Sequence, residues 1–156
     1  MQNRNLFLIV LLLMLPLMAA EPAGYKYWGA AELKGMSKTM APKVNAQHVA
    51  LENLGEFGPD RAIMVHREGS GEAELHETEA DVIFVTSGAG TLLIGGTMPG
   101  SRNTAPGEVR APAVEGASSK QKMAVGDVLH VPPKIPHQVT LEPGKQITYF
   151  VLKVKE

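Results

Sequence analysis

The chain has 156 residues, of which 15 are Lys or Arg, 16 are Asp or Glu and none is Cys. A formal charge of −1 at neutral pH excludes the broad basic surface that nucleic acids require. The lack of cysteine excludes disulfides, zinc fingers, iron–sulfur clusters and a thiol nucleophile. The length suits one domain, and 16 Gly with 11 Pro favour a turn-rich β protein.

The N-terminal segment is typical of a secretory signal peptide. It contains Arg4, then an uninterrupted apolar run, then Pro16 and the small pair Ala19-Ala20. We predict that residues 1–20 are removed during export, that the protein is secreted or periplasmic, and that it does not associate with a membrane afterwards. The alternative is an uncleaved leader that anchors the protein in a membrane, because Met18 fits the cleavage site poorly.

Residues 21–46 are predicted to form an N-terminal arm. The stretch from Trp28 to Met40 places Leu33, Met36 and Met40 at helical spacing. Gly35 within this stretch and the proline that follows it limit the prediction to one or two loose helical turns.

Residues 47–156 have the pattern of an all-β domain. Short apolar and β-branched runs alternate with separators rich in Gly and Pro, including 87–90, which we interpret as a hairpin turn. Seven strands are predicted, over residues 62–66, 73–76, 82–86, 91–94, 128–131, 138–141 and 147–154. No convincing long helix accompanies them, so the pattern favours a sandwich or barrel over a doubly wound α/β fold.

The predicted strand from Val82 to Val85 is apolar at every position, which indicates that both of its faces are covered. One face would line the barrel interior. The other requires the N-terminal arm, a second sheet or another subunit. We predict a homodimer, whereas a monomer would mean that the arm covers this face.

Residues 97–119 are rich in Pro, Gly and Ser and have weak periodicity. We interpret them as a long loop with room for a short hairpin. A loop of this length is often a lid or an interaction element, and a solvated surface excursion is the alternative.

Polar residues that could carry chemistry occur at two places. Glu74 and His76 lie two apart on a predicted strand and therefore project from the same face. Asp81 begins the returning strand and can lie near that pair. His137 stands at a strand entrance after the proline-rich turn 132–136, whose fixed φ angles would aim it reproducibly.

The other three histidines carry weaker signals. His130 alternates with apolar neighbours on a predicted strand, which favours a core histidine over one that lines a pocket. His66 is expected at the surface or on a rim, and His48 precedes the barrel.

These segments resemble the two sequence motifs of the cupin superfamily. In the first, Glu74 and His76 stand at the two usual His positions, Asp81 replaces the usual Glu, and Gly88 closes the motif. The resemblance covers about residues 60 to 154. It implies a single-domain cupin, whose fold is a double-stranded β-helix, or jelly-roll, barrel.

The second motif begins at Gly126 and ends at His137, with Lys134 in place of its inner glycine. The resemblance implies a divalent metal, Fe, Mn or Zn, at the barrel mouth. By position its ligands would be Glu74, His76, Asp81 and His137, a donor set that suits these metals. The alternative is a metal-free pocket in which the two carboxylates pair with the two histidines.

Three classes of function remain open at this level. We predict an exported cupin-domain protein that binds a divalent metal and binds or acts on a small molecule. The alternatives are a metal-free barrel that binds a small ligand, and a structural, dimer-forming barrel without catalysis. No catalytic residue stands out in the sequence, so the choice between enzyme and binding protein stays open, since this fold hosts many roles.

Overall fold

Residues 21–156 are described by the computed structural model, and the predicted leader, residues 1–20, lies outside the described residues. The described part contains α1 (Ala30–Met40), the 3-10 turn η1 (Ala41–Lys43), β1 (Val49–Phe57), β2 (Asp60–Arg67), β3 (Ala73–His76), β4 (Glu79–Ile94), β5 (Arg102–Ala105), β6 (Glu108–Ala111), β7 (Ser119–Ala124), β8 (Val128–Val131), β9 (His137–Thr140) and β10 (Ile147–Lys155). Among these residues, no helix has the length and apolar character needed to cross a membrane.

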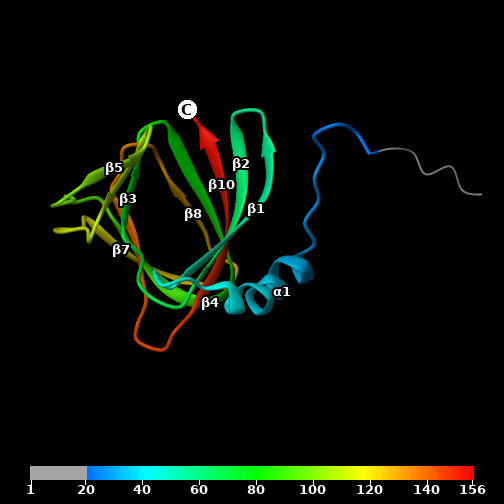
Figure 1. Cartoon of the computed structure of the whole chain (residues 1–156), viewed down its shortest axis with the longest axis horizontal. Helices are drawn as coiled ribbons and strands as arrows, with labels where there is room; N and C mark the ends of the chain where they lie inside the picture. Colours follow the sequence, from blue (N-terminus) through cyan, green and yellow to red (C-terminus); the bar gives the residue numbers. More distant parts are fainter. Residues whose placement is uncertain (1–20) are drawn as a thin grey trace, which may run out of the picture.

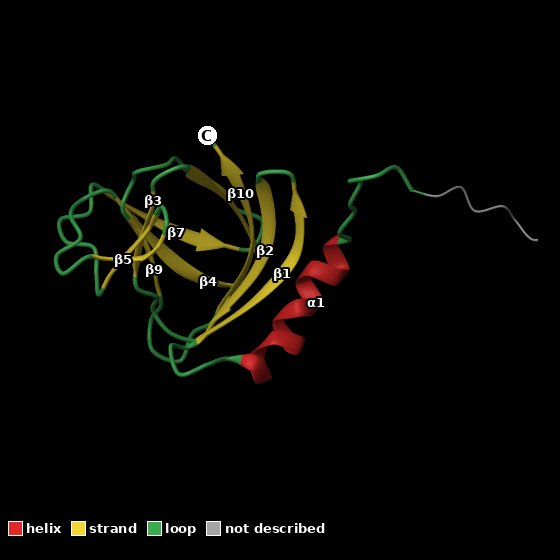
Figure 2. Ribbon diagram, turned by 45° about the horizontal axis from the view of Figure 1, so that its top comes forward, coloured by secondary structure: helices red, strands yellow, loops and turns green. Residues whose placement is uncertain are grey.

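The strands form a curled antiparallel sheet that wraps around an interior, with α1 on the outside (Figures 1 and 2). The strand order is β1-β2-β10-β4-β9-β3-β6-β5, and β7 and β8 also pair with β4. The predicted all-β, jelly-roll architecture is confirmed. The interior is filled by aliphatic side chains and one tyrosine, namely Val65, Ile83, Val85, Leu92, Met123, Val131, Val139, Ile147, Tyr149 and Val151.

The prediction of a hairpin turn at 87–90 is wrong, because β4 runs unbroken through these residues. Gly88 has a φ of +72°, and a Cβ atom there would collide with the backbone carbonyl of Gln146. Only glycine adopts this conformation without strain. The strand therefore kinks without ending: its first part pairs with β10 and β8, and its last part pairs with β7 and β9.

The N-terminal arm contains a longer helix than the sequence predicts. Gly35 lies inside α1 and does not end it. The helix packs Leu33, Met36 and the fully buried Met40 against the outer face of β2 and β10. The ring of Trp28 also lies 5.1 Å from that of Phe150. Packing against the barrel thus stabilises a helix whose own propensity is weak.

The central apolar strand is covered on its inner face and partly open on its outer face. Ile83 and Val85 are buried in the interior, whereas Phe84 is 40% exposed. Phe84 lies opposite Val128 of β8, which is 58% exposed. The arm therefore covers only part of the outer surface, and the homodimer stays a prediction.

Residues 97–119 join the sheet over β5, β6 and the first residue of β7. They contain the β5–β6 hairpin, and β6 pairs with β3 along its whole length. The buried side-chain amide of Gln138 holds the segment in place: it donates to the Gly71 carbonyl at 2.7 Å and accepts from the Val114 N–H at 3.1 Å. The short hairpin is present as predicted: β5 is exposed along its length, whereas β6 is tied to β3, so the segment is a solvated excursion with an anchored base and not a free lid.

Candidate metal centre

The four sequence-predicted ligands come together at one end of the barrel interior. Glu74 and His76 come from β3, Asp81 from β4 and His137 from β9. Glu74 and His137 are direct partners in neighbouring strands. One nitrogen or oxygen atom from each of the four lies within 4.8 Å of the others.

The facing atoms of this cluster are spaced like ligands that share one ion. Asp81 Oδ2 lies 3.3 Å from His76 Nε2 and 3.7 Å from His137 Nε2. Glu74 Oε2 lies 3.7 Å from His76 Nε2. Ligand atoms bound at about 2.1 Å to one metal are roughly 3.0–3.4 Å apart, so small adjustments would complete the site.

Each imidazole has its other nitrogen engaged. His76 Nδ1 donates to Glu108 Oε2 at 2.8 Å, and His137 Nδ1 donates to the Ile135 carbonyl at 3.0 Å. Because both acceptors take a proton on Nδ1, each ring presents Nε2 to the cluster, and a metal that displaced any proton there would find its lone pair. Metal-binding histidines are held in this way, with the second nitrogen donating to a carboxylate or carbonyl.

The turn before His137 is fixed by an unusual residue. Lys134, which stands where the motif has glycine, adopts the left-handed conformation with a φ of +63°. Its backbone N–H donates to the carbonyl of His76 at 2.7 Å. This bond ties the proline-rich turn to β3 and brings His137 beside His76, where the ring centroids lie 5.3 Å apart.

Glu74 is held by two arginines. Its Oε1 accepts from Arg67 at 3.0 Å and pairs with Arg110 at 2.5 Å, while Oε2 faces His76. Burial raises the pKa of Glu74, but the charges of Arg110, His137 and Arg67 outweigh burial and hold it below its usual value. Glu74 is therefore an ionised carboxylate with one oxygen left for the cluster.

Lys153 places an ammonium group in the same cluster. Its Nζ lies 2.7 Å from Asp81 Oδ1 and 2.8 Å from His76 Nε2. Burial opposes ionisation of Asp81, yet hydrogen bonds from His137 and His76 and the charge of Lys153 bring its pKa well below the usual range.

The pKa of His76 shows the effect of the same neighbouring charges. Burial lowers the pKa of His76, but hydrogen bonds to Asp81 and Glu108 raise it to about 9, even though Lys153 opposes them. The pKa of Glu108 is likewise lowered, since the hydrogen bond and charge of His76 outweigh its burial. Carboxylates surrounding one ring thus stabilise positive charge at this position.

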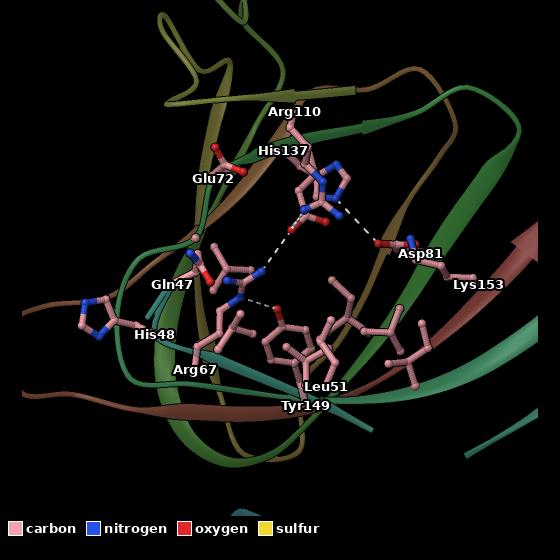
Figure 3. Close-up of a pocket in the computed structure, with 18 of the residues that line it drawn as sticks. Gln47, His48, Leu51, Arg67, Glu72, Asp81, Arg110, His137, Tyr149 and Lys153 are labelled. Atoms are coloured by element: carbon pink, nitrogen blue, oxygen red, sulfur yellow. Dashed lines mark hydrogen bonds and ion pairs between the residues drawn. The ribbon is translucent and has the colours of Figure 1, made fainter. Parts of the chain in front are cut away.

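A cavity of about 630 Å³ opens beside the cluster. Figure 3 shows Arg67 between Tyr149 and the cluster, with Asp81 and Lys153 side by side. Arg67 Nε donates to the Tyr149 hydroxyl at 2.9 Å. Burial raises the pKa of Tyr149, so its phenol stays protonated. The cavity therefore combines charged groups with aliphatic walls formed by Val49, Ile63, Val65, Ile83, Val139 and Val151.

Sequence reasoning missed several polar residues of this site. Glu108 and Arg110 lie in the segment interpreted as a loop, although their alternation around Val109 is the pattern of a strand with one polar face. Lys153 has the same strand phase as Tyr149 and Val151, which face the interior. A charged residue at an interior position was the available signal.

Two histidines differ from expectation. His130 is not in the core: its side chain is 56% exposed and lies 4.0 Å from Glu156. His66 is not on a rim, because it is 2% exposed and its Nδ1 lies 2.7 Å from Thr148 Oγ1. Both sit on the outward-facing phase of their strands, which the sequence pattern did not reveal.

A second group of potential ligands, His76, Glu79 and Glu108, adjoins the first. Arg61 already lies between its carboxylates, at 2.9 Å from Glu79 and 3.7 Å from Glu108. His76 also uses Nδ1 to hold Glu108. This second group therefore supports the orientation of His76.

Comparisons with known proteins identify the fold. No protein family model matches the chain, and no curated protein matches it by sequence. The cupin domain of Schizosaccharomyces pombe Cnp3 is similar in structure, with a TM-score of 0.52 and 12% identity over 74% of this chain and 71% of that one. A cupin-2 domain from Rhodospirillum rubrum has a TM-score of 0.50 and 13% identity, over 70% of this chain and 62% of that one.

The DMSP lyase DddQ from Ruegeria pomeroyi has a TM-score of 0.49 and 18% identity, and this chain covers 48% of its length. The similarities to the Cnp3 and Rhodospirillum rubrum domains, at 12% and 13% identity, establish the fold and no shared activity. The chain has the cupin fold, as its resemblance to the two motifs implied.

Proposed function

We propose that this protein is an exported cupin-domain protein that binds a divalent metal through Glu74, His76, Asp81 and His137. One observation carries the proposal: both histidines have Nδ1 engaged elsewhere and direct Nε2 toward two ionised carboxylates. Iron, manganese and zinc suit this set of two imidazoles and two carboxylates. When bound, such an ion acts as a Lewis acid toward an oxygen of a bound small molecule.

The chain's own residues would prepare the site for this role. Arg67 and Arg110 keep Glu74 ionised and turn Oε2 toward the cluster. Tyr149 accepts from Arg67, which leaves its hydroxyl proton available to a ligand in the cavity. The aliphatic walls exclude water and bury the apolar part of a small molecule. We therefore infer a small-molecule ligand or substrate.

Lys153 supports the competing, metal-free function. Its ammonium already bonds Asp81 and His76, and so neutralises the cluster without an ion. A barrel stabilised in this way would bind a small ligand through the cavity alone. The two functions differ in a single measurable property, the uptake of metal.

Metal uptake tests the proposal directly. Purified protein should bind close to one Mn²⁺, Fe²⁺ or Zn²⁺ per chain in calorimetric titrations and by elemental analysis. His76→Ala and His137→Ala should each lower the affinity at least tenfold while circular dichroism shows an intact barrel. His130→Ala is the matched control, because His130 is exposed on the outer surface. A folded wild-type protein that takes up no metal would establish the metal-free alternative.

Export is supported by the composition of residues 1–20. Mass spectrometry of protein expressed with its leader distinguishes the alternatives. A mature chain that begins near Glu21 supports export with cleavage. An intact chain in the membrane fraction indicates an anchor.

We also propose that a second copy of the chain covers the outer face around Phe84 and Val128. These residues lie opposite each other, are exposed and continue the apolar surface that reaches Phe150. Light scattering should give twice the monomer mass, and Phe84→Glu should shift the protein to a monomer. A monomeric wild-type protein would contradict this proposal.

A further inference from the structure

Lys153 contacts two of the four candidate metal ligands, His76 and Asp81. It projects inward from β10 in phase with Tyr149 and Val151, and its side chain is 10% exposed. Its ammonium bonds one oxygen of Asp81 and the Nε2 atom of His76. The next carboxylate, Glu79, is 3.9 Å away. An ion bound by His76 and Asp81 would therefore compete directly with this ammonium.

We propose that Lys153 becomes the carboxylate-binding residue of the pocket when a metal is bound. The ion binds Nε2 of His76 in place of the ring's second proton, and an N–H of Lys153, whose Nζ lies 2.8 Å from this atom, turns to a ligand. This inference rests on the proposed metal site and names the class of its small molecule: an organic carboxylate with an apolar body.

The atoms of Asp81 explain why Lys153 stays beside the site. Asp81 divides its two oxygens, since Oδ1 accepts from Lys153 and Oδ2 faces His76 and His137. Coordination through Oδ2 leaves the Lys153–Oδ1 bond in place. Nε2 of His76 has room for one proton or one ion, so a bound ion excludes the contact of 2.8 Å with Lys153. Lys153 thus loses one partner and keeps the other.

The charges around the cavity favour an anion in the loaded state. Four carboxylates line it, Glu72, Glu74, Asp81 and Glu108, and so do four basic residues, Arg61, Arg67, Arg110 and Lys153. With neutral imidazoles these charges balance. A divalent ion then adds two positive charges in a partly desolvated space, where charge is costly unless it is compensated. A carboxylate ligand supplies part of that compensation.

Lys153 is better suited to this role than the arginines. Arg67 and Arg110 both hold Glu74, and Arg61 holds Glu79, so their carboxylate partners are already assigned. The metal removes a partner from Lys153 alone. Beyond Lys153 the cavity is walled by Val65, Val139 and Val151, which would contact the hydrocarbon part of the ligand.

The test compares Lys153→Met with Lys155→Met. Lys155 is two residues further along the same strand and is exposed, which makes it a matched control. Calorimetry first measures Mn²⁺ binding and then the binding of butyrate to the Mn²⁺-loaded protein. Lys153→Met should bind Mn²⁺ about tenfold more tightly, because a competing positive charge is gone. It should bind butyrate roughly tenfold more weakly, while Lys155→Met changes neither affinity.

Two further ligands define the chemistry. Butyramide has the same carbon skeleton without the charge and should bind the loaded wild-type protein at least tenfold more weakly than butyrate. Inorganic phosphate carries charge without an apolar body and should also bind more weakly. Equal binding of butyramide would overturn the role of charge, and equal binding of phosphate would overturn the organic ligand class.

Tighter binding of Mn²⁺ together with weaker binding of butyrate identifies the role of Lys153. A purely structural lysine would weaken both, and that result would overturn the inference. Lys153→Gln should reproduce the pattern, so a misfolded Met variant does not end the test. If wild-type protein and variants all take up none of Mn²⁺, Fe²⁺ and Zn²⁺, the proposed function fails and this inference fails with it. If wild-type protein binds Mn²⁺ but Lys153→Gln binds it no more tightly, the inference fails alone.

Discussion

The two faces of β2 and β10 differ although the same strands form them. Outward-facing residues, Met64 and Phe150 among them, are apolar and pack under α1. Inward-facing residues at neighbouring positions, including Arg67 and Lys153, are charged and bonded to groups of the cluster. The outer face therefore supplies stability through apolar burial, whereas the inner face places costly polar groups where they can bind a ligand.

The largest loss of stability is expected from a substitution in the apolar outer face. Phe150 is 7% exposed and its ring contacts those of Trp28 and Phe84. Phe150→Ala should lower the free energy of unfolding by about 3–5 kcal/mol, because it removes transfer energy and leaves a cavity. Urea denaturation measures this loss. The folded fraction should keep wild-type metal affinity, and a large loss of affinity would mean that the two faces are coupled.

A substitution on the inner face should lower metal affinity strongly and the free energy of unfolding only slightly. Glu108→Gln removes the carboxylate that orients His76 and should lower metal affinity by about 10–100-fold. Its effect on unfolding should be smaller than that of Phe150→Ala. Glu77→Gln, at an exposed position near the same strand end, is the control. Unchanged metal affinity in Glu108→Gln would show that the negative charge of Glu108 does not matter for binding.

Alkaline pH should lower the stability of the metal-free protein through the inner-face residue His76. The pKa of His76 is raised to about 9 in the folded chain, so its contribution is complete below the unfolded value near 6.5. That contribution is lost as pH rises through about 9. The free energy of unfolding should fall by roughly 1–3 kcal/mol between pH 6.5 and 9.5. Urea denaturation across this range should show a smaller fall in His76→Gln, and equal falls would refute the assignment.

The smallest change in stability is expected at the turn before His137. Lys134 has a φ of +63°, which costs a residue with a side chain about 1–2 kcal/mol. Lys134→Gly removes this strain but adds freedom to the unfolded chain, so the net gain should be about 0.5–1 kcal/mol. Thermal unfolding measures it. Destabilisation would mean that the Lys134 side chain makes a contribution of its own.

The sequence predicted the parts of this comparison that depend on local spacing. The separation of two residues between Glu74 and His76 placed them on one face, and the proline-rich turn placed His137 at a strand entrance. All four candidate ligands do lie together. The alternation of residues along a strand thus suffices to predict which side chains share a face.

Other parts depend on contacts between distant segments. Glu108 reaches His76 only because β6 pairs with β3, and Lys153 reaches Asp81 only because β10 pairs with β4. The kink at Gly88 looks like a turn until the pairing of β4 with four other strands is known. The length of α1 depends likewise on its packing against Met64 and Phe150. Local patterns do not contain these pairings.

X-ray absorption spectroscopy of the metal-loaded protein tests the central claim most directly, because it reports the ligands of the ion. Zinc-loaded wild-type protein should show two imidazole nitrogens together with oxygen ligands and no sulfur, at about 2.0–2.2 Å. His76→Ala and His137→Ala should each leave one imidazole, and His130→Ala should leave two. A spectrum without imidazole, or one unchanged in His76→Ala and His137→Ala, would contradict a metal centre built from Glu74, His76, Asp81 and His137.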